Sequence, residues 1–230
     1  MNHPKVLVLI LSYNGKPLLD DAVSSYLVND YDNFEVVVID NGSSDGTATY
    51  VREQWPEVHV HRTEENLGYS GGFNFGLDYA FNQLQADYVL ITNNDVKVDR
   101  KVIGALVDVA ETDSQIGFVS GKVYYYDHPD TLQTVGKQEH PIKWNGEHIG
   151  GREVDNGQFD EISERTFIDD VFMLVRREVY EKVGDYDTTF FIQGEEFDWQ
   201  ARAKNAGFKI FYTPHAKIRH KESMTIGKQS

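Results

Sequence analysis

Four segments of the sequence place Asn, Asp and Gly where a buried strand is expected to end or where the chain has just left one. The segments are "SYNG" (12–15), "DNGSSDGT" (40–47), "ENLGYSGGFNFG" (65–76) and "NND" (93–95). Asn and Asp favour turns, so one such segment alone would indicate only a turn. In an open parallel sheet, ligands bind beyond the carboxyl ends of the strands. Four polar segments at one edge therefore favour a ligand-binding crevice.

The triplet Asn93-Asn94-Asp95 is the segment best suited to a metal ion and a phosphate. Hard divalent ions take one or two carboxylates, with phosphate and water completing the shell, and Asp95 supplies a carboxylate. His220, at the end of a late apolar segment, is the candidate second ligand and would suit Mn²⁺ better than Mg²⁺. The alternatives are a plain turn at the triplet and a core or surface role for the histidine. Asn93 and Asn94 are expected to support the turn or to contact a ribose.

Two further segments have the chemistry of a nucleotide site. Asp40 can accept a hydrogen bond from the ring NH of a base such as uracil, or can instead cap the turn that follows it. The glycine-rich stretch from Gly68 to Gly72 opens a helix, where the backbone can approach a ligand closely and the helix N-terminus favours anions. Asn66 and Asn74 flank this stretch as possible polar contacts, and a plain tight turn is the alternative.

An acidic cluster, Glu195, Glu196 and Asp198, lies at the start of a late helix. Acids in this position complement the helix dipole, which is the structural interpretation. The functional interpretation is a general base that activates a hydroxyl nucleophile.

The elements that must position these residues alternate in the first half of the chain. Apolar runs predict strands at 6–11, 34–39, 58–62 and 87–92, and helical spacing predicts helices at 18–27, 43–55, 73–84 and 99–112. This βαβαβαβ order predicts a parallel sheet with right-handed crossovers. In the second half we expect strand material at 116–127, a long loop with a hairpin at 136–165, a strand and helix at 169–184, a helix at 195–207, and short strands at 208–214 and 216–220.

The composition excludes several classes of protein. A net charge of −15 argues against nucleic acid as a partner, and the absence of cysteine excludes disulfides and thiolate metal sites. No apolar run approaches the roughly 20 residues that span a bilayer, and no start typical of a signal peptide is present. We expect one domain (1–230, with a nucleotide-sugar half at 1–98 and a catalytic half at 99–230). A cytoplasmic location is expected, with peripheral contact at the inner face of the membrane left open.

Taken together, the motifs resemble those of the family 2 glycosyltransferases, inverting enzymes of the GT-A fold, in the rhamnosyltransferase-like branch. The resemblance rests on the order of "LSYNG", "VVVIDNGSSDGT", "ENLGYSGGFNFGL", "LITNNDV", "GEEFDW" and "IRHKES" and covers nearly the whole chain. It implies a Rossmann-like, mostly parallel sheet with helices on both faces. It also implies transfer of a sugar from a nucleoside-diphosphate sugar, UDP- or dTDP-linked by preference, to an acceptor hydroxyl in cell-surface polysaccharide or glycoconjugate assembly.

The resemblance also assigns roles to residues. It implies a divalent ion, Mn²⁺ or Mg²⁺, at Asp95 and His220, and a base at Glu196, where the family usually has Asp; Glu195 and Asp198 stay open as alternatives. Asp170, beside Asp169, and Trp199 are candidates for the acceptor site, although core packing is the alternative for the tryptophan. The residues expected at the nucleotide sugar are Tyr13, Asn14, Asp40, Asn66, Gly68, Gly71, Gly72, Asn74, Asn93, Asn94 and Asp95.

The expected partners are the sugar-nucleotide donor and a glycan or lipid-linked sugar acceptor. Two alternatives stay open: a non-catalytic protein that binds a nucleotide sugar, and a sugar-phosphate nucleotidyltransferase. A nucleotidyltransferase would be expected to carry a glycine-rich, basic loop after the first strand, and "SYNGKPLL" is not such a loop.

Overall fold

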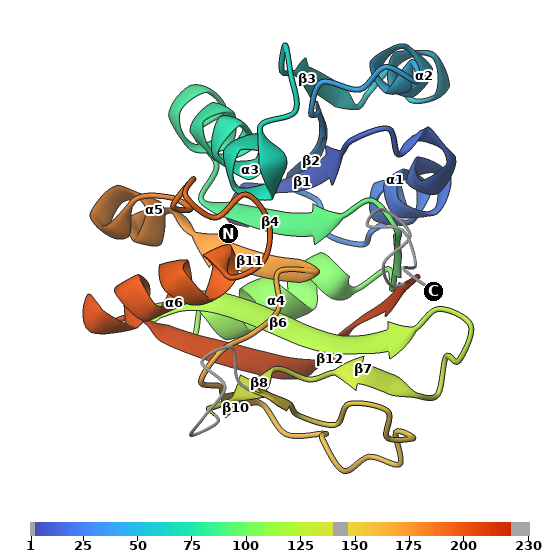
Figure 1. The fold of residues 1–230 in the computed structure, drawn as a ribbon. Helices are drawn as coiled ribbons and strands as arrows, with labels where there is room; N and C mark the ends of the chain where they lie inside the picture. Colours follow the sequence, from blue (N-terminus) through green and yellow to red (C-terminus); the bar gives the residue numbers. More distant parts are fainter. Residues whose placement is uncertain (1–2, 140–146, 222–230) are drawn as a thin grey trace.

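The apolar runs of the first half form a parallel sheet, as predicted. The computed structural model describes residues 3–139 and 147–221. Strands β1 (Val6–Ser12), β2 (Phe34–Asp40), β3 (His59–Arg62) and β4 (Tyr88–Asn93) lie side by side in the order β3-β2-β1-β4 (Figure 1). In the register of these strands, Ser12 pairs with Asp40 and Leu11 pairs with Asn93. The polar residues that follow β1, β2 and β4 are therefore brought to one edge of the sheet.

Helices cover both faces of this sheet, which explains why its strands are continuously apolar. One apolar cluster packs under α1 (Leu19–Leu27), α2 (Thr47–Gln54) and α4 (Val102–Ala110). The other packs under α3 (Gly68–Asp78), the π-helical turn η2 (Tyr79–Gln83) that continues it, α5 (Arg177–Val183) and α6 (Glu195–Asn205). A short 3-10 turn, η1 (Lys16–Leu18), precedes α1.

The second half extends the same sheet. Strand β11 (Phe172–Arg176) runs antiparallel between β4 and β6 (Ile116–Tyr125), and β12 (Lys209–His220) runs parallel to β6 (Figure 1). Short strands at the margin are β5 (Val96–Val98), which pairs with β12, β7 (Leu132–Thr134), which pairs with β6, and β10 (Ser163–Glu164), which pairs with β12. The hairpin expected in the long loop is β8 (Lys137–Gln138) with β9 (Glu147–His148); residues 140–146 between them lie outside the described residues.

Several predicted boundaries differ from the structure. The strands expected at 208–214 and 216–220 are one strand, β12, with an irregular register between Thr213 and Lys217, where Pro214 cannot donate to the ladder. Helix α2 begins at Thr47 rather than at Ser43, because Gly46 has a φ of +83°. Helix α3 begins at Gly68, so the glycine-rich stretch that was expected to open a helix forms its first turn.

Among the described residues, no helix combines the length and apolar character that a membrane crossing requires.

Candidate active site

A cavity of about 540 Å³ lies at the carboxyl ends of β1 and β4, lined by the start of α3 and by residues of the second half. It brings together many of the residues predicted from the sequence, namely Tyr13, Asn66, Gly68, Asn93, Asn94, Asp170, Glu195, Glu196 and His220. The predicted residues that do not line it are Asn14, Asp40, Gly71, Gly72, Asn74, Asp95, Asp198 and Trp199.

Asp95 and His220 form a buried pair beside the cavity. The Asp95 Oδ1 atom lies 3.1 Å from His220 Nε2, and the two side chains are 4% and 8% exposed. The other ring nitrogen, Nδ1, lies 2.7 Å from Gln133 Oε1. An amide oxygen can only accept, so Nδ1 is the donor in this contact and Nε2 is the ring nitrogen that faces the carboxylate.

This donor set fits a divalent ion. Two neighbouring ligands of an octahedral ion bound at about 2.1 Å are about 3 Å apart, close to the observed separation of the carboxylate oxygen and the imidazole nitrogen. The Gln133 side chain holds the ring orientation, which is the usual role of a second partner to a metal-binding histidine. Gln133 could not be predicted from the sequence, because it lies 87 residues from His220 in the chain.

The two asparagines before Asp95 are held in place by neighbouring elements. Asn94 Nδ2 donates to Ser12 Oγ over 3.2 Å, and Asn93 Oδ1 accepts from the Tyr69 hydroxyl over 3.3 Å. A Cβ on Gly15 would come within 2.2 Å of Asn94 Nδ2, so the glycine makes room for this amide. Asn93 Nδ2 also lies 3.5 Å from His220 Nε2. The triplet is thus a turn whose side chains face the cavity and the candidate metal position.

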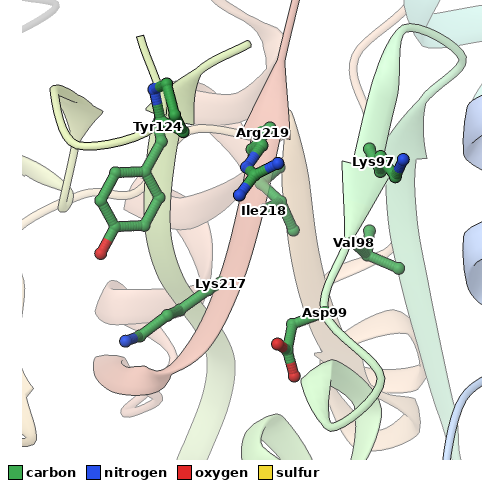
Figure 2. A pocket seen from close by; sticks show the side chains of 8 residues that line it. Lys97, Val98, Asp99, Tyr124, Lys217, Ile218 and Arg219 are labelled. Carbon is green, nitrogen blue, oxygen red and sulfur yellow. The ribbon is translucent and has the colours of Figure 1, made fainter.

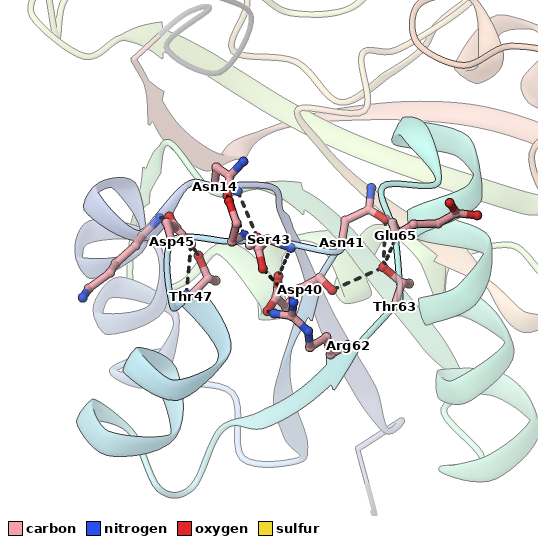
Figure 3. A network of polar contacts seen from close by, with 11 residues as sticks. Asn14, Asp40, Asn41, Ser43, Asp45, Thr47, Arg62, Thr63 and Glu65 are labelled. Atoms are coloured by element: carbon pink, nitrogen blue, oxygen red, sulfur yellow. Dashed lines mark hydrogen bonds and ion pairs between the residues drawn. The ribbon is translucent and has the colours of Figure 1, made fainter.

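The tip of β2 has polar partners within the protein (Figure 3). Asp40 is fully buried; its Oδ1 accepts from the Ser43 backbone over 2.9 Å and its Oδ2 pairs with Arg62 Nη1 at 2.5 Å. Asn14, with a φ of +49°, accepts from the Ser44 backbone over 2.8 Å. These contacts join the loops after β1 and β2. A direct contact of Asp40 with a base stays a prediction.

Asn41, which the sequence analysis did not single out, holds the glycine-rich segment. Its Nδ2 donates to the Gly68 carbonyl over 2.9 Å, and its Oδ1 accepts from the Leu67 backbone over 3.1 Å. A Cβ on Gly72 would lie 2.6 Å from Leu11 Cδ1 and 3.0 Å from Asn41 Nδ2. A Cβ on Gly71 would lie 2.8 Å from Leu67 Cβ. These two glycines therefore allow close packing around α3, and neither of them lines the cavity.

Three other predicted residues have partners within the protein. Both atoms of the Asn74 amide bond the Tyr186 backbone, at 2.8 and 3.0 Å. Asp198 pairs with Arg202 at 2.7 Å on α6 and does not line the cavity, and its role as base stays a prediction. Trp199 is fully buried and donates to the Gly184 carbonyl over 2.8 Å, which makes it a core residue.

Three of the carboxyl groups that line the cavity form a tight cluster. One carboxylate oxygen from each of Asp170, Glu195 and Glu196 lies within 4.8 Å of the other two. Burial, with mutual repulsion among the acids, raises the pKa of Asp170 well above its usual value. Burial raises the pKa of Glu195 and, with the charge of Glu195 adding to it, raises the pKa of Glu196 to about 7. Carboxylates at this spacing can hold a cation, but pKa values raised toward neutrality suit proton transfer.

A buried ion pair lies behind this cluster. Lys137 Nζ is 2.7 Å from Asp169 Oδ1 and 3.9 Å from Glu196 Oε1. Burial opposes ionisation of Asp169, but a hydrogen bond with His148 and the charge of Lys137 outweigh it and hold the Asp169 pKa at about 2. Glu196 Oε2 also accepts from the Gly194 backbone over 3.1 Å. Glu196 is therefore the acid of the cluster whose charged form has a nearby cation.

Known proteins resemble this chain in sequence. The sequence profile described as glycosyl transferase family 2 matches residues 7–184. A curated N-acetylglucosaminyl-diphospho-decaprenol L-rhamnosyltransferase of Mycobacterium tuberculosis is 26% identical, over 96% of this chain and 77% of its own length. A poly-beta-1,6-N-acetyl-D-glucosamine synthase of Staphylococcus aureus is 24% identical over 92% of this chain, which spans 48% of that protein.

Solved structures show the same fold. GalNAc-T7, in a crystal structure with UDP, GalNAc and Mn²⁺, superimposes with a TM-score of 0.74 at 17% identity, over 95% of this chain and 44% of its own. The mannosyltransferase PcManGT from Pyrobaculum calidifontis, in complex with GDP-Man and Mn²⁺, gives a TM-score of 0.69 at 19% identity, over 98% and 59%. The fold is the GT-A fold predicted from the motifs. By its sequence profile and by the curated relatives that it matches, the chain belongs to the family 2 glycosyltransferases.

Proposed function

We propose that this glycosyltransferase moves a sugar from a nucleoside-diphosphate donor to an acceptor hydroxyl with inversion, and that Glu196 is the base. One observation carries the proposal: the cavity that is lined by Glu196 is also lined by His220, the partner of buried Asp95. A group that takes a proton and a pair that fits a divalent ion therefore serve one site. The alternative, a nucleotide-sugar-binding protein without activity, does not explain a buried carboxyl with a raised pKa, which is typical of a group that transfers protons.

Asp95 and His220 would hold the ion. A bound Mn²⁺ or Mg²⁺ would offset the negative charge that develops on the leaving diphosphate. The protein's own contribution is to keep Nε2 of the imidazole directed at that position through Gln133, and to keep both ligands buried.

Glu196 would take the proton in a single displacement. The acceptor oxygen attacks the anomeric carbon from the face opposite the diphosphate, and its proton passes to the Glu196 carboxylate. The new bond joins the acceptor oxygen to the anomeric carbon, and the bond from that carbon to the diphosphate oxygen breaks. Because one displacement occurs, the anomeric configuration inverts. The pKa of about 7 gives Glu196 a substantial ionised fraction at neutral pH while keeping it basic.

A lipid-linked sugar is the acceptor class that the relatives support. The Mycobacterium tuberculosis relative is named for transfer of L-rhamnose to N-acetylglucosaminyl-diphospho-decaprenol. We propose by analogy an acceptor sugar carried on a lipid diphosphate, and a UDP- or dTDP-linked donor.

A groove of about 350 Å³, lined by Lys97, Lys217 and Arg219 together with Asp99, has a net basic charge that fits a membrane carrying such a lipid (Figure 2). Lys97 lies directly opposite Arg219 in the pairing of β5 with β12, and Lys217 lies two residues earlier on β12. Within residues 3–139 and 147–221, no carboxylate is within ion-pair distance of these three side chains. Like charges directly opposite one another destabilise a sheet, so an anionic partner would relieve the arrangement.

A donor screen tests the proposed function. The protein would be incubated with Mn²⁺, N-acetylglucosaminyl-diphospho-farnesol and each of a panel of UDP-, dTDP- and GDP-sugars, with release of nucleoside diphosphate as the readout. We expect release with a pyrimidine nucleotide and a product of inverted anomeric configuration by ¹H NMR. Metal-dependent donor binding without turnover across the panel would favour the binding protein without activity, and release of pyrophosphate from a sugar phosphate and a nucleoside triphosphate would favour a nucleotidyltransferase.

A further inference from the structure

Phe191 is a large apolar side chain that stays exposed at the cavity. It is 59% exposed, and the adjacent Ile192 is 47% exposed, whereas Phe73, Phe81, Phe118 and Phe172 are fully buried. Both residues line the cavity that also contains Glu195 and Glu196. Apolar side chains left in water beside a polar cavity are typical of a surface that a ligand covers.

The ring of Phe191 is seated against the backbone of Gly68. A Cβ on Gly68 would lie 2.7 and 2.9 Å from two ring carbons and 2.6 Å from the Phe191 carbonyl oxygen. Gly68 has a φ of +75°, which also favours glycine. The Tyr69 backbone donates to the Phe191 carbonyl over 2.8 Å, and the Ser70 hydroxyl donates to the Phe190 carbonyl. The segment before α6 is thus fixed to the start of α3, and the ring keeps its orientation.

The same segment fixes the distance between the ring and the acids. Gln193 and Gly194 have φ values of +72° and +103°, so two successive left-handed residues turn the chain from Phe191 into α6. A non-glycine residue in this region is uncommon and persists when its surroundings hold it. The Gly194 backbone then donates to Glu196 Oε2 over 3.1 Å. The aromatic ring and the proposed base are therefore parts of one fixed turn.

Glu195 supplies a polar group that has no partner. The side chain is buried, yet its Oε2 atom has no hydrogen-bond partner among the described residues. A buried acceptor without a partner is costly, and such atoms are usually satisfied by protein, water or ligand. Glu195 also lines the cavity, so a ligand there lies beside this side chain.

We propose that Phe191 is the platform on which the acceptor's sugar ring lies, with Glu195 accepting one of its hydroxyl groups. A pyranose has a face of C–H bonds and an edge of hydroxyl groups, which match an exposed aromatic ring beside one unpaired carboxyl oxygen. A hydrocarbon chain would leave the oxygen of Glu195 without a partner. The inference rests on the proposed function, since it assigns the acceptor to the side of the cavity that holds Glu196.

Binding and kinetics with sugar probes test the platform. Saturation-transfer NMR would be run on the full chain with Mn²⁺, UDP or dTDP, and the methyl pyranosides of glucose, galactose, mannose, rhamnose and N-acetylglucosamine. We expect at least one pyranoside to receive saturation mainly on the C–H protons of one face. Phe191→Ala should weaken its binding about tenfold, Phe191→Leu should weaken it similarly because planarity is lost, and Phe191→Trp should restore it. The matched control is Phe75→Ala, an exposed phenylalanine on α3 that does not line the cavity.

The kinetic readout separates stacking from a structural role. With an accepted glycoside, Phe191→Ala should raise the acceptor KM about tenfold while kcat and the donor KM change by roughly twofold or less. No pyranoside binding to the wild type, or equal binding by Phe191→Ala, overturns the platform. A wild type that transfers sugar but is insensitive to Phe191 overturns the platform alone. A wild type that binds pyranosides through Phe191 but never releases nucleoside diphosphate contradicts the proposed function alone.

Discussion

The acids around the cavity differ in protonation because their neighbours differ. Asp169 contacts Lys137 and His148, and its pKa stays at about 2 in spite of burial. Glu196 Oε1 lies farther from the same lysine, 3.9 Å from its Nζ, and the pKa of Glu196 rises to about 7. Asp170 accepts from the Tyr186 hydroxyl over 3.2 Å, but burial and three neighbouring acids raise its pKa well above the usual value. The local arrangement of one cation therefore selects Glu196 as the group that titrates near neutral pH.

This selection predicts a pH profile. Glu196 accepts a proton only when ionised, so kcat/KM should rise as the pH rises through about 7 and level off above it. Lys137 favours the carboxylate, so Lys137→Met should raise the Glu196 pKa and move the rising limb to higher pH. Rates measured between about pH 5 and 9 would check this, with Lys209→Met, which removes a pair with Asp113, as the control. A limb that stays in place in Lys137→Met would show that the lysine does not tune the base.

Helix α3 packs close to the sheet because glycines lie on its inner face. We predict that Gly72→Ala lowers the free energy of unfolding by about 1–3 kcal/mol, since the added Cβ meets Leu11 and Asn41. Gly104, inside α4, is the matched control: its added Cβ would meet only Tyr31, at 3.8 Å. Gly104→Ala should raise the free energy of unfolding by up to about 1 kcal/mol, because alanine is the better helix former. Urea unfolding measures both changes, and an equal effect of the two substitutions would refute the packing role of Gly72.

The strands and the cavity edge could be predicted from the sequence because the signals are local. The apolar runs that became β1, β2 and β4 are buried on both faces, and parallel register then brings their polar ends together. Gln133, Lys137 and Phe191 gave no such signal, since their roles depend on contacts with distant segments. Gln133 meets His220 across 87 residues, and Lys137 comes from the hairpin, whose position within the long loop the sequence did not indicate. Asn74, Asp198 and Trp199 likewise have partners within the protein that the sequence does not reveal.

The basic groove differs in charge from the molecule as a whole. The chain carries a net charge of −15, so an anionic membrane would repel most of its surface. Lys97, Lys217 and Arg219 line one groove together with Asp99, and among the described residues none of the three basic side chains is within ion-pair distance of an acid (Figure 2). Basic residues near an anionic membrane contribute about 1 kcal/mol each, so the groove can orient the protein but gives only modest affinity.

We therefore predict weak, salt-sensitive binding to acidic vesicles. Sedimentation with vesicles containing phosphatidylglycerol should retain more protein than sedimentation with phosphatidylcholine alone, and about 0.5 M salt should remove the difference. The triple substitution Lys97→Glu, Lys217→Glu and Arg219→Glu should abolish it. Substituting Arg52, Lys101 and Arg152, exposed basic residues outside the groove, with Glu gives the same change in net charge. Equal loss in both triple variants would mean that net charge, not the groove, controls binding.

The proposed function requires Glu196 to remove the acceptor proton in a cavity that binds the donor independently of that residue. Its most direct test is the rate of nucleoside diphosphate release by Glu196→Gln with donor, acceptor and Mn²⁺, measured alongside calorimetric affinity for the nucleoside diphosphate. We predict a loss of turnover of about 100-fold or more with the nucleotide affinity unchanged within roughly twofold. Turnover by Glu196→Gln at the wild-type rate would show that Glu196 is not the base.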